Sequence, residues 1–375
     1  MPAPVNAPAV QQDVESNPGA HRLRHDAQRS LAVTVRPARR EDGPALAQLE
    51  YDSPRGSGIV ITDRRHDFFY KTAMFNDGVA LVLERAGTSS PAAVIAGSLA
   101  PVRLSGNDVA ALLMSEFYAD AQVPRGLDRG MLRLWIEFVA AARQKGARAI
   151  FGVVKSDNDR AMSIYERAGA RRCGTWRLST LPVVRTRKEA RGVVVETTID
   201  AVADQAEVGA AFGGMDLFPA DTPPGGWQWV YDRFVRARVR WGGASCKIWD
   251  ATAECERIVV DLPLGYRLIR PLTTFASRFL PMPRIPAAGA MVTSWIVYDL
   301  ILPPRTSPAP MLSAVRNLAL EHGIDYVVVA ANCDDWAMRQ ISRQAIATLD
   351  YLLVVKDLDG RHTLAGSPYF DIRRS

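Results

Sequence analysis

Two carboxylates and a phenol in the first half of the sequence have side chains that can move a proton. Glu116 and Asp120 lie four residues apart in segment 111–123, which we predict to be a strand, so both side chains point to one face. Tyr165 lies in segment 157–168, a predicted helix. A carboxylate can accept a proton from a nucleophile, and a phenol can donate one to a leaving group. These residues are the candidate acid–base groups; a solvated strand face and a core tyrosine are the alternative interpretations.

A short motif places Tyr165 on its predicted helix. The run KSDNDRAMSIYERAG has the spacing N-x-x-A-x-x-x-Y-x-x-x-G, formed by Asn158, Ala161, Tyr165 and Gly169. Asn158 is the predicted N-cap, because an asparagine side chain accepts hydrogen bonds from the N–H groups of the first turn. Ala161 and Tyr165 are four residues apart and therefore share one face of the helix.

A loop rich in arginine and glycine leads into the predicted helix 130–145. Its sequence is VPRGLDRGML, and its candidate phosphate-binding residues are Val123, Arg125, Gly126, Arg129 and Gly130. Glycines let the backbone approach a phosphate closely, and the N–H groups at a helix start favour an anion. Asp128 stands where such a loop needs a glycine, and its charge repels phosphate. Two interpretations of this segment therefore remain: it binds a phosphate, or it is a basic loop without a ligand.

The order of the predicted elements defines the fold class. Residues 31–180 alternate as strand, helix, helix, three strands, helix, strand, helix and strand. A helix that crosses between two neighbouring strands demands a parallel pair, here beside an antiparallel meander, so we expect an α/β fold with one mixed sheet. The later part of this pattern recurs over residues 307–356, which predicts a second, weaker copy. The predicted organisation is a tail at 1–30, a domain at 31–200, a bridging segment at 201–243 and a degenerate domain at 244–375.

Two further segments have a distinctive composition. Residues 52–66 are rich in Gly, Ser, Asp and Arg and are predicted to be a loop. Residues 227–240 alternate Trp and Arg with apolar residues and are predicted to be a helix. Packing between the domains is the preferred role for that helix, and stacking on nucleic-acid bases is the alternative.

Charge and cysteine content restrict the possible partners. The formal net charge is +6, carried mostly by Arg, which fits an anionic partner; the compositional habit of a GC-rich genome is the other interpretation. The four cysteines and five histidines show no metal-ligand spacing, so no metal is expected. No apolar run approaches about 18 residues. Residues 1–30 also lack the apolar core of a signal peptide, so we expect a cytoplasmic protein without a membrane partner.

These motifs carry a resemblance to a known family. In its order of elements and in the run SDNDRAMSIYERAGARR, the N-terminal half resembles the GNAT superfamily of N-acyltransferases. The whole chain is similar to a narrower group, the plant hookless-type N-acetyltransferase-like proteins and their bacterial relatives. The matching runs are RQKGARAIFGVVKSDNDRAMSIY, RLSTLPVV, CKIWDA, FASRFLPMPRIP and SPYFDIRR. The resemblance therefore covers residues 32–374, with only short patches in the last third.

The resemblance implies two GNAT-like domains in tandem, of which the second is degenerate. It also implies acetyl-CoA or another acyl-CoA as donor and an amine of a small molecule or a protein as acceptor. By position, the pyrophosphate would bind to Arg125, Gly126, Arg129 and Gly130, and the pantetheine region to Asn158. Tyr165 would protonate the leaving thiolate. Glu116 and Asp120 lie where the family often places a base, and Glu116 or a water would take the proton of the amine.

Two other functions stay open. A transferase of this fold can use an acyl carrier protein or an aminoacyl-tRNA as donor, which the irregular loop at Asp128 and the positive charge favour. A degenerate chain can also be a non-catalytic interaction or regulatory module. Thioester turnover separates an enzyme from such a module. A steep salt dependence separates a macromolecular anionic donor from free CoA.

Overall fold

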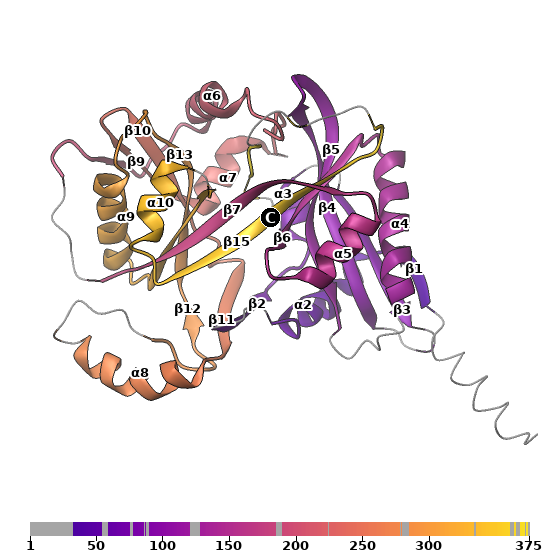
Figure 1. Cartoon of the computed structure of the whole chain (residues 1–375), viewed down its shortest axis with the longest axis horizontal. Coiled ribbons are helices and arrows are strands. Elements are labelled where there is room, and N and C mark those ends of the chain that lie inside the picture. Colours follow the sequence, from indigo (N-terminus) through magenta and orange to yellow (C-terminus); the bar gives the residue numbers. More distant parts are fainter. Residues whose placement is uncertain are drawn as a thin grey trace, which may run out of the picture.

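Most strands of the chain join one large sheet (Figure 1). The computed structural model describes residues 33–373 except 55–58, 76–77, 86, 88–89, 121–127, 185–189, 224, 278, 280–284, 334, 361–363, 365–367 and 372. The twelve strands of the large sheet are, in spatial order, β1 (Val33–Pro37), β3 (Gly78–Arg85), β4 (Pro91–Leu104), β5 (Asn107–Ala119), β6 (Ala149–Lys155), β15 (Ala347–Asp357), β7 (Arg171–Pro182), β14 (Tyr326–Asn332), β13 (Ser294–Ile301), β10 (Ala244–Trp249), β9 (Val235–Trp241) and β8 (Val194–Glu196). A second sheet holds β12 (Met291–Val292), β11 (Cys255–Asp261) and β2 (Val60–Arg65).

The first half has the expected order of strands. β1, β3, β4 and β5 are antiparallel neighbours, and β5 and β6 form a parallel pair. The crossover between that pair is α4 (Asp128–Gln144), which buries Leu134, Trp135 and Phe138 because these residues recur at helical spacing. The expected mixed α/β sheet, with a parallel pair beside a meander, is confirmed.

Helices cover both faces of this half. α4 and α5 (Asp159–Arg167) share one core cluster with β3 to β6. The other face is covered by α2 (Gly43–Tyr51), which follows the short helix η1 (Arg40–Asp42) and buries Leu46 and Leu49 against Val82 and Val94. The remaining helix, α3 (Tyr70–Met74), sends Met74 into a cluster that belongs mainly to the second half.

The second half repeats the arrangement of a parallel pair with helices on both faces. β13 and β14 are parallel and are joined by α9 (Ala309–Glu321). α9 and α10 (Trp336–Ser342) pack into one core cluster of this half. The other side holds α6 (Ala201–Phe212) and α7 (Gly226–Phe234). One further helix, α8 (Leu264–Ala276), stands away from the rest at the lower left of Figure 1.

The two long strands at the centre are exchanged between the halves. β15 follows α10 in the sequence but pairs with β6, and β7 follows α5 but pairs with β14. β7 and β15 also pair with each other, which makes the sheet continuous (Figure 1). Each half therefore completes its sheet with a strand from the other half.

Two predicted elements are wrong. Part of the predicted loop 52–66 is the strand β2, which pairs with β11 about 190 residues away, a partner that the local sequence does not reveal. The predicted helix 227–240 ends at Phe234, and its arginine-rich end is the strand β9. In β9 the residues Val235, Ala237 and Val239 are buried at every second position, which is the period of a strand.

Candidate active site

The pairing of β5 with β6 ends part-way along both strands, at a place that we call the strand parting (Met114 and Gly152). Backbone pairing stops at these two residues. Beyond them β5 continues beside β4 and carries a bulge in which Ser115 is the extra residue. A Cβ at Gly152 would lie 2.9 Å from the Cε of Met114, so only glycine fits there without displacing that side chain. Bulges of this kind often lie next to active sites, because they redirect the following side chains.

Tyr165 extends from α5 to the strand parting. Its hydroxyl donates a hydrogen bond to Sδ of Met114 over 3.4 Å. Its ring packs edge-on against Trp135, with 5.3 Å between the centroids, and lies 6.2 Å from the ring of Phe117. Burial raises the pKa of this phenol, so Tyr165 is protonated at neutral pH and can donate. The predicted acid is thus a buried proton donor in contact with a sulfur atom.

The predicted cofactor residues are described in part. Val123, Arg125 and Gly126 lie outside the described residues. α4 begins at Asp128, so Arg129 and Gly130 lie in its first turn, where the N–H groups have no partner within the helix. Anions are favoured at such a position. The contact of these residues with a phosphate stays a prediction.

Asn158 caps α5, as predicted. Its Oδ1 accepts a hydrogen bond from the backbone N–H of Ala161 over 3.0 Å. Ala161 packs at the edge of the core cluster that contains Tyr165. Both residues therefore fix the start and the rotation of α5, and through it the direction of Tyr165. Their contact with a donor stays a prediction.

Glu116 belongs to a buried set of charges that we call the Arg65 triad (Glu50, Arg65 and Glu116). Nη1 of Arg65 lies 2.7 Å from Oε1 of Glu116, and its Nε lies 2.7 Å from Oε2 of Glu50. Lys71 Nζ lies 3.5 Å from the same oxygen of Glu116, and the Tyr118 hydroxyl donates to Glu50 over 2.9 Å. α2, β2 and β5 each supply one triad member, and every triad side chain is at most 3% exposed.

These contacts set the proton affinity of Glu116. Burial alone would raise its pKa, but the charges of Arg65 and Lys71 outweigh burial and lower the pKa to about 2. A general base works best with a pKa near the working pH, so this carboxylate is a weak acceptor at neutral pH. The surroundings favour a positioning role for Glu116. The other predicted carboxylate, Asp120, is about one-third exposed and lies 3.1 Å from Arg85.

The lowered pKa predicts how acid affects stability. Because the folded-state pKa of Glu116 lies below its ordinary value of 4.5, the folded protein binds fewer protons there than the unfolded chain. The stabilisation is complete above pH 4.5 and is lost as the pH falls toward about 2. We expect Glu116→Gln to lower the free energy of unfolding at neutral pH by about 3 kcal/mol, because Arg65 loses one of its two buried partners. Thermal unfolding across this pH range measures both effects.

The matched control is Glu137→Gln on α4. Glu137 also faces an arginine, at 3.8 Å from Arg133, but both side chains are about half exposed. Such a pair contributes little, so this variant should differ from the wild type by less than about 0.5 kcal/mol. An acid sensitivity that is equal in the wild type and in Glu116→Gln would contradict the assignment.

A pocket of about 710 Å³ opens beside the Arg65 triad, on the face of the sheet that α2 covers. Its lining includes Arg40, Gln48, Tyr51, Arg64, Arg65 and His66. Three of these side chains are arginines, of which Arg40 pairs with Asp67 and Arg64 with Glu256. The pocket therefore has three guanidinium groups in its wall, and Arg65 joins it to Glu116 at the bulge of β5.

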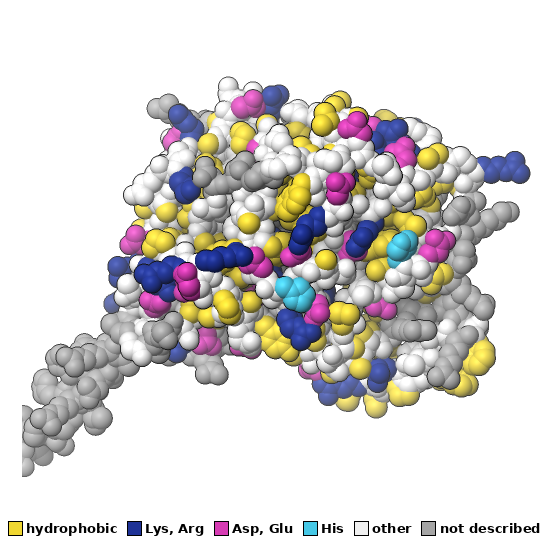
Figure 2. Space-filling view, turned by 180° about the vertical axis from the view of Figure 1, so that it is seen from behind, with side chains coloured by type: hydrophobic (Ala, Val, Ile, Leu, Met, Phe, Trp, Pro, Cys, Tyr) yellow, Lys and Arg dark blue, Asp and Glu magenta, His cyan; other side chains and the backbone are white. Residues whose placement is uncertain are grey.

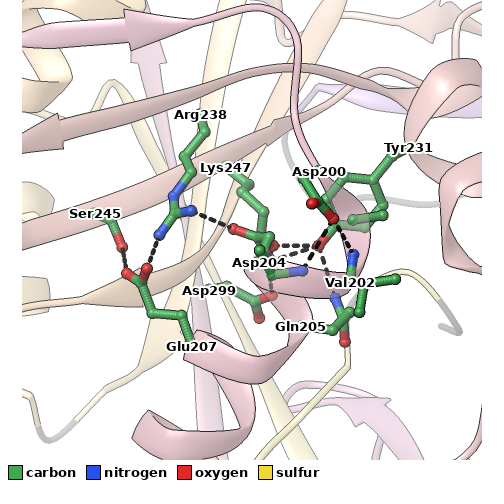
Figure 3. Close-up of polar contacts among 12 residues, drawn as sticks. Asp200, Val202, Asp204, Gln205, Glu207, Tyr231, Arg238, Ser245, Lys247 and Asp299 are labelled. Atoms are coloured by element: carbon green, nitrogen blue, oxygen red, sulfur yellow. Dashed lines mark hydrogen bonds and ion pairs between the residues drawn. The ribbon is translucent and has the colours of Figure 1, made fainter.

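The second half contains a counterpart, the Lys247 triad (Asp204, Lys247 and Asp299; Figure 3). Lys247 Nζ lies 2.5 Å from Asp204 Oδ2 and 2.8 Å from Asp299 Oδ2. Asp299 lies in a bulge of β13, two residues after the last residue of that strand that pairs with β14, and its φ is +46°. Asp204 lies on α6. As in the Arg65 triad, a buried cation lies between a helix carboxylate and a bulge carboxylate.

Tyrosines and an arginine complete this second set of charges. Tyr231 donates to Asp204, and Tyr369 donates to Asp299 over 2.6 Å. Arg238 lies 3.1 Å from Asp204 and also pairs with Glu207 (Figure 3). Burial lowers the pKa of Lys247, but Asp299, Tyr231 and Asp204 outweigh burial and raise it, so this lysine is charged. The polar groups at the place where β13 stops pairing with β14 are thus held in ion pairs and hydrogen bonds with one another.

Apart from Glu116, no member of either triad was among the sequence-based candidates. The available signal was a charged residue inside an otherwise apolar strand, as at Lys247, because all six residues of ASCKIW are buried. Arg65 gave no such signal, since it lies in ITDRR, where polar residues surround it. Their partners come from other elements and cannot be read from spacing along the chain.

Known structures resemble this arrangement. Saccharomyces cerevisiae N-myristoyltransferase with bound myristoyl-CoA matches with a TM-score of 0.58 and 8% identity over 92% of this chain and 82% of that chain. A second structure of that protein, also with bound myristoyl-CoA, gives 0.57 and 7% over 92% and 86%. The GCN5-related glucosamine N-acetyltransferase region of a fungal multi-domain GH3 β-N-acetylglucosaminidase gives 0.54 and 12% over 87% of this chain and 38% of that chain. No protein-family model and no curated protein matches the sequence.

These likenesses show the fold. The chain has the fold of the GNAT N-acyltransferases, with the parallel pair, the bulge and the crossover helix described above. In the described part of the chain, no group of three or more His, Cys, Asp or Glu residues is arranged to hold a metal ion. No helix among the described residues is long and apolar enough to cross a membrane.

Proposed function

We propose that the protein is an acyltransferase that moves an acyl group from a thioester donor, acyl-CoA, to an amine. The observation that carries the proposal is the strand parting with the Tyr165 hydroxyl directed at it. Beyond Met114 and Gly152 no ladder of backbone hydrogen bonds separates β5 from β6, so groups on the two faces of the sheet can meet there. Neighbours of this fold include a protein solved with bound myristoyl-CoA, which supports a thioester donor.

The two faces suggest a division of roles. The donor lies on the face of α4 and α5, with its pyrophosphate at the first turn of α4 near Arg129 and Gly130. The acceptor amine enters from the pocket beside α2. The amine attacks the thioester carbonyl, the C–S bond breaks, and Tyr165 gives its proton to the leaving thiolate. A water takes the proton of the amine, while Glu116 holds Arg65 at the wall of the pocket.

The direct test of the donor is calorimetry with the whole protein. We expect acetyl-CoA or a longer acyl-CoA to bind with a Kd on the order of 10 μM, which corresponds to about −7 kcal/mol. Raising the salt concentration should weaken binding moderately, because few phosphates are neutralised. Thiol release from the bound acyl-CoA in the presence of amines then measures turnover. Absence of binding at both salt concentrations would exclude free acyl-CoA, and acylated carrier protein and charged tRNA would be tested next.

The two halves are proposed to be tandem GNAT-like domains with exchanged last strands, within residues 31–200 and 244–375, and the bridging segment 201–243 supplies α6 with Asp204 to the second half. Each half has a parallel pair that ends beside a bulge, and each has a buried acid–base–acid triad at that place. The second half is the non-catalytic one, since near the position that matches Tyr165 it has Ser342, which is hydrogen-bonded to Ser179 and offers no phenol. The similarity to the hookless-type group is part of this proposal.

A further inference from the structure

α8 carries a stripe of large apolar side chains that are exposed to solvent. The stripe, which we call the α8 stripe, consists of Leu264, Leu268, Leu272, Phe275 and Phe279, whose exposed fractions are 70%, 71%, 68%, 60% and 63%. Their spacing of four, four, three and four residues places them on one side of the helix and its continuation. Single exposed leucines are ordinary, but a contiguous apolar patch of several hundred Å² marks an interaction site.

The α8 stripe points away from the rest of the molecule. Thr273 is the one buried residue of α8, and its position five residues after Leu268 places it on the far side of the helix from the stripe. The helix therefore contacts the protein with its opposite face. In Figure 1 it projects from the lower edge, and in Figure 2 hydrophobic and basic side chains lie together along the corresponding edge.

Charge identifies the kind of surface that the stripe fits. Residues 262–298 contain no Asp or Glu, whereas they contain Arg267, Arg270, Arg278 and Arg284. The nearest acidic residue before α8 is Asp261, which pairs with Arg267. Leucine and phenylalanine on one face of a helix, in a segment whose charged residues are all arginines, is the composition of helices that lie in the headgroup region of a lipid bilayer. Arginines near an anionic membrane surface add electrostatic attraction.

The size of the stripe argues against a second copy of the chain as the partner. α8 has 13 residues. A helix of that length is about 20 Å long and about 10 Å wide, so its contact face covers only a few hundred Å². A stable protein interface buries about 800 Å² on each partner. The bilayer has no such requirement, because it accepts individual side chains.

We propose that α8 docks the protein onto an anionic membrane surface, with the α8 stripe inserted among the lipids. The sequence-based expectation of no membrane partner rested on the lack of a long apolar run, which excludes a spanning helix but not one that lies on the surface. The docking is independent of the acyl transfer proposed above, because the stripe contains none of the candidate active-site residues.

The test is co-sedimentation of the full chain with vesicles of phosphatidylcholine alone and of phosphatidylcholine mixed with phosphatidylserine. We expect binding to the mixed vesicles, weakened by salt, and little binding to the neutral ones. The double variant Leu268→Gln and Leu272→Gln should bind the mixed vesicles more than about tenfold more weakly, because it removes two inserted side chains. Both leucines are mainly exposed, so the variant should keep the melting temperature of the wild type.

Val202→Gln is the matched control. Val202 on α6 is 76% exposed, so this change replaces one exposed apolar side chain by glutamine at a site away from α8. Its vesicle binding should equal that of the wild type. Equal binding by the double variant and the wild type, or absence of binding to the mixed vesicles, would overturn the proposal. A wild-type dimer that the double variant abolishes, measured by light scattering without lipid, would assign the stripe to a second copy instead.

Discussion

Replacing Tyr165 by phenylalanine is expected to lower kcat for acyl transfer by about 100-fold, the scale of one general acid. The substitution removes only the hydroxyl, which donates to Sδ of Met114 at the strand parting. The KM for acyl-CoA should change little, because the hydroxyl acts when the C–S bond breaks. The free energy of unfolding should fall by no more than about 1 kcal/mol, because one neutral hydrogen bond to sulfur is lost. Steady-state thiol release measures the first effect and thermal unfolding the second.

Two controls separate chemistry from packing. Tyr298→Phe removes a hydroxyl from a tyrosine that is equally buried, and this hydroxyl has no hydrogen-bond partner among the described residues. Met114→Leu removes the sulfur acceptor but keeps the volume and the Tyr165 hydroxyl. Both variants should keep kcat within about threefold of the wild type, since neither removes the donated proton. Full turnover by Tyr165→Phe would remove this residue from the mechanism.

The sequence predicted those elements whose pattern is local. The buried run at 149–154, the amphipathic helix at 130–145 and the cap at Asn158 follow from neighbours within one or two turns, and the structure confirms all three. β2 was missed because its partner β11 is distant in the sequence. β9 was missed because it follows directly on the helix α7 and carries arginines between its buried residues. α8 was missed because tertiary packing contributes little to it, and Pro271 within it is unfavourable for a helix.

Of the candidate site, too, only the part that depends on local spacing could be predicted from the sequence. Tyr165 and Asn158 belong to one helical motif, so their relation could be derived from spacing. The ion pairs of Glu116 could not, because Glu50, Arg65 and Glu116 come from three elements that only the fold brings together. A carboxylate on a strand can be a base or an ion-pair member. The neighbours, and not the residue type, decide which.

Cutting the chain after Gly192 is expected to abolish independent folding of the first half. β15, which separates β6 from β7, would then be absent. Leu352 and Val354 of β15 pack into the core under α4 and α5, and Leu353 and Val355 pack into the core on the opposite face. Burial of such side chains contributes about 1.5–3 kcal/mol each. Their loss therefore removes on the order of 6 kcal/mol, which is comparable with the whole stability of a domain.

The competing outcome is that β7 closes onto β6 and takes the place of β15. The sequences of the two strands argue against this substitution. β15 offers LLVV at the positions that pair with β6, with apolar side chains for both faces, whereas the corresponding stretch of β7 is RRCGT. We expect residues 1–192 to lack a cooperative thermal transition when produced alone and to regain one when produced together with residues 193–375. A cooperative transition of the first fragment alone would show that the exchanged strand is dispensable and that the first half is an independent domain.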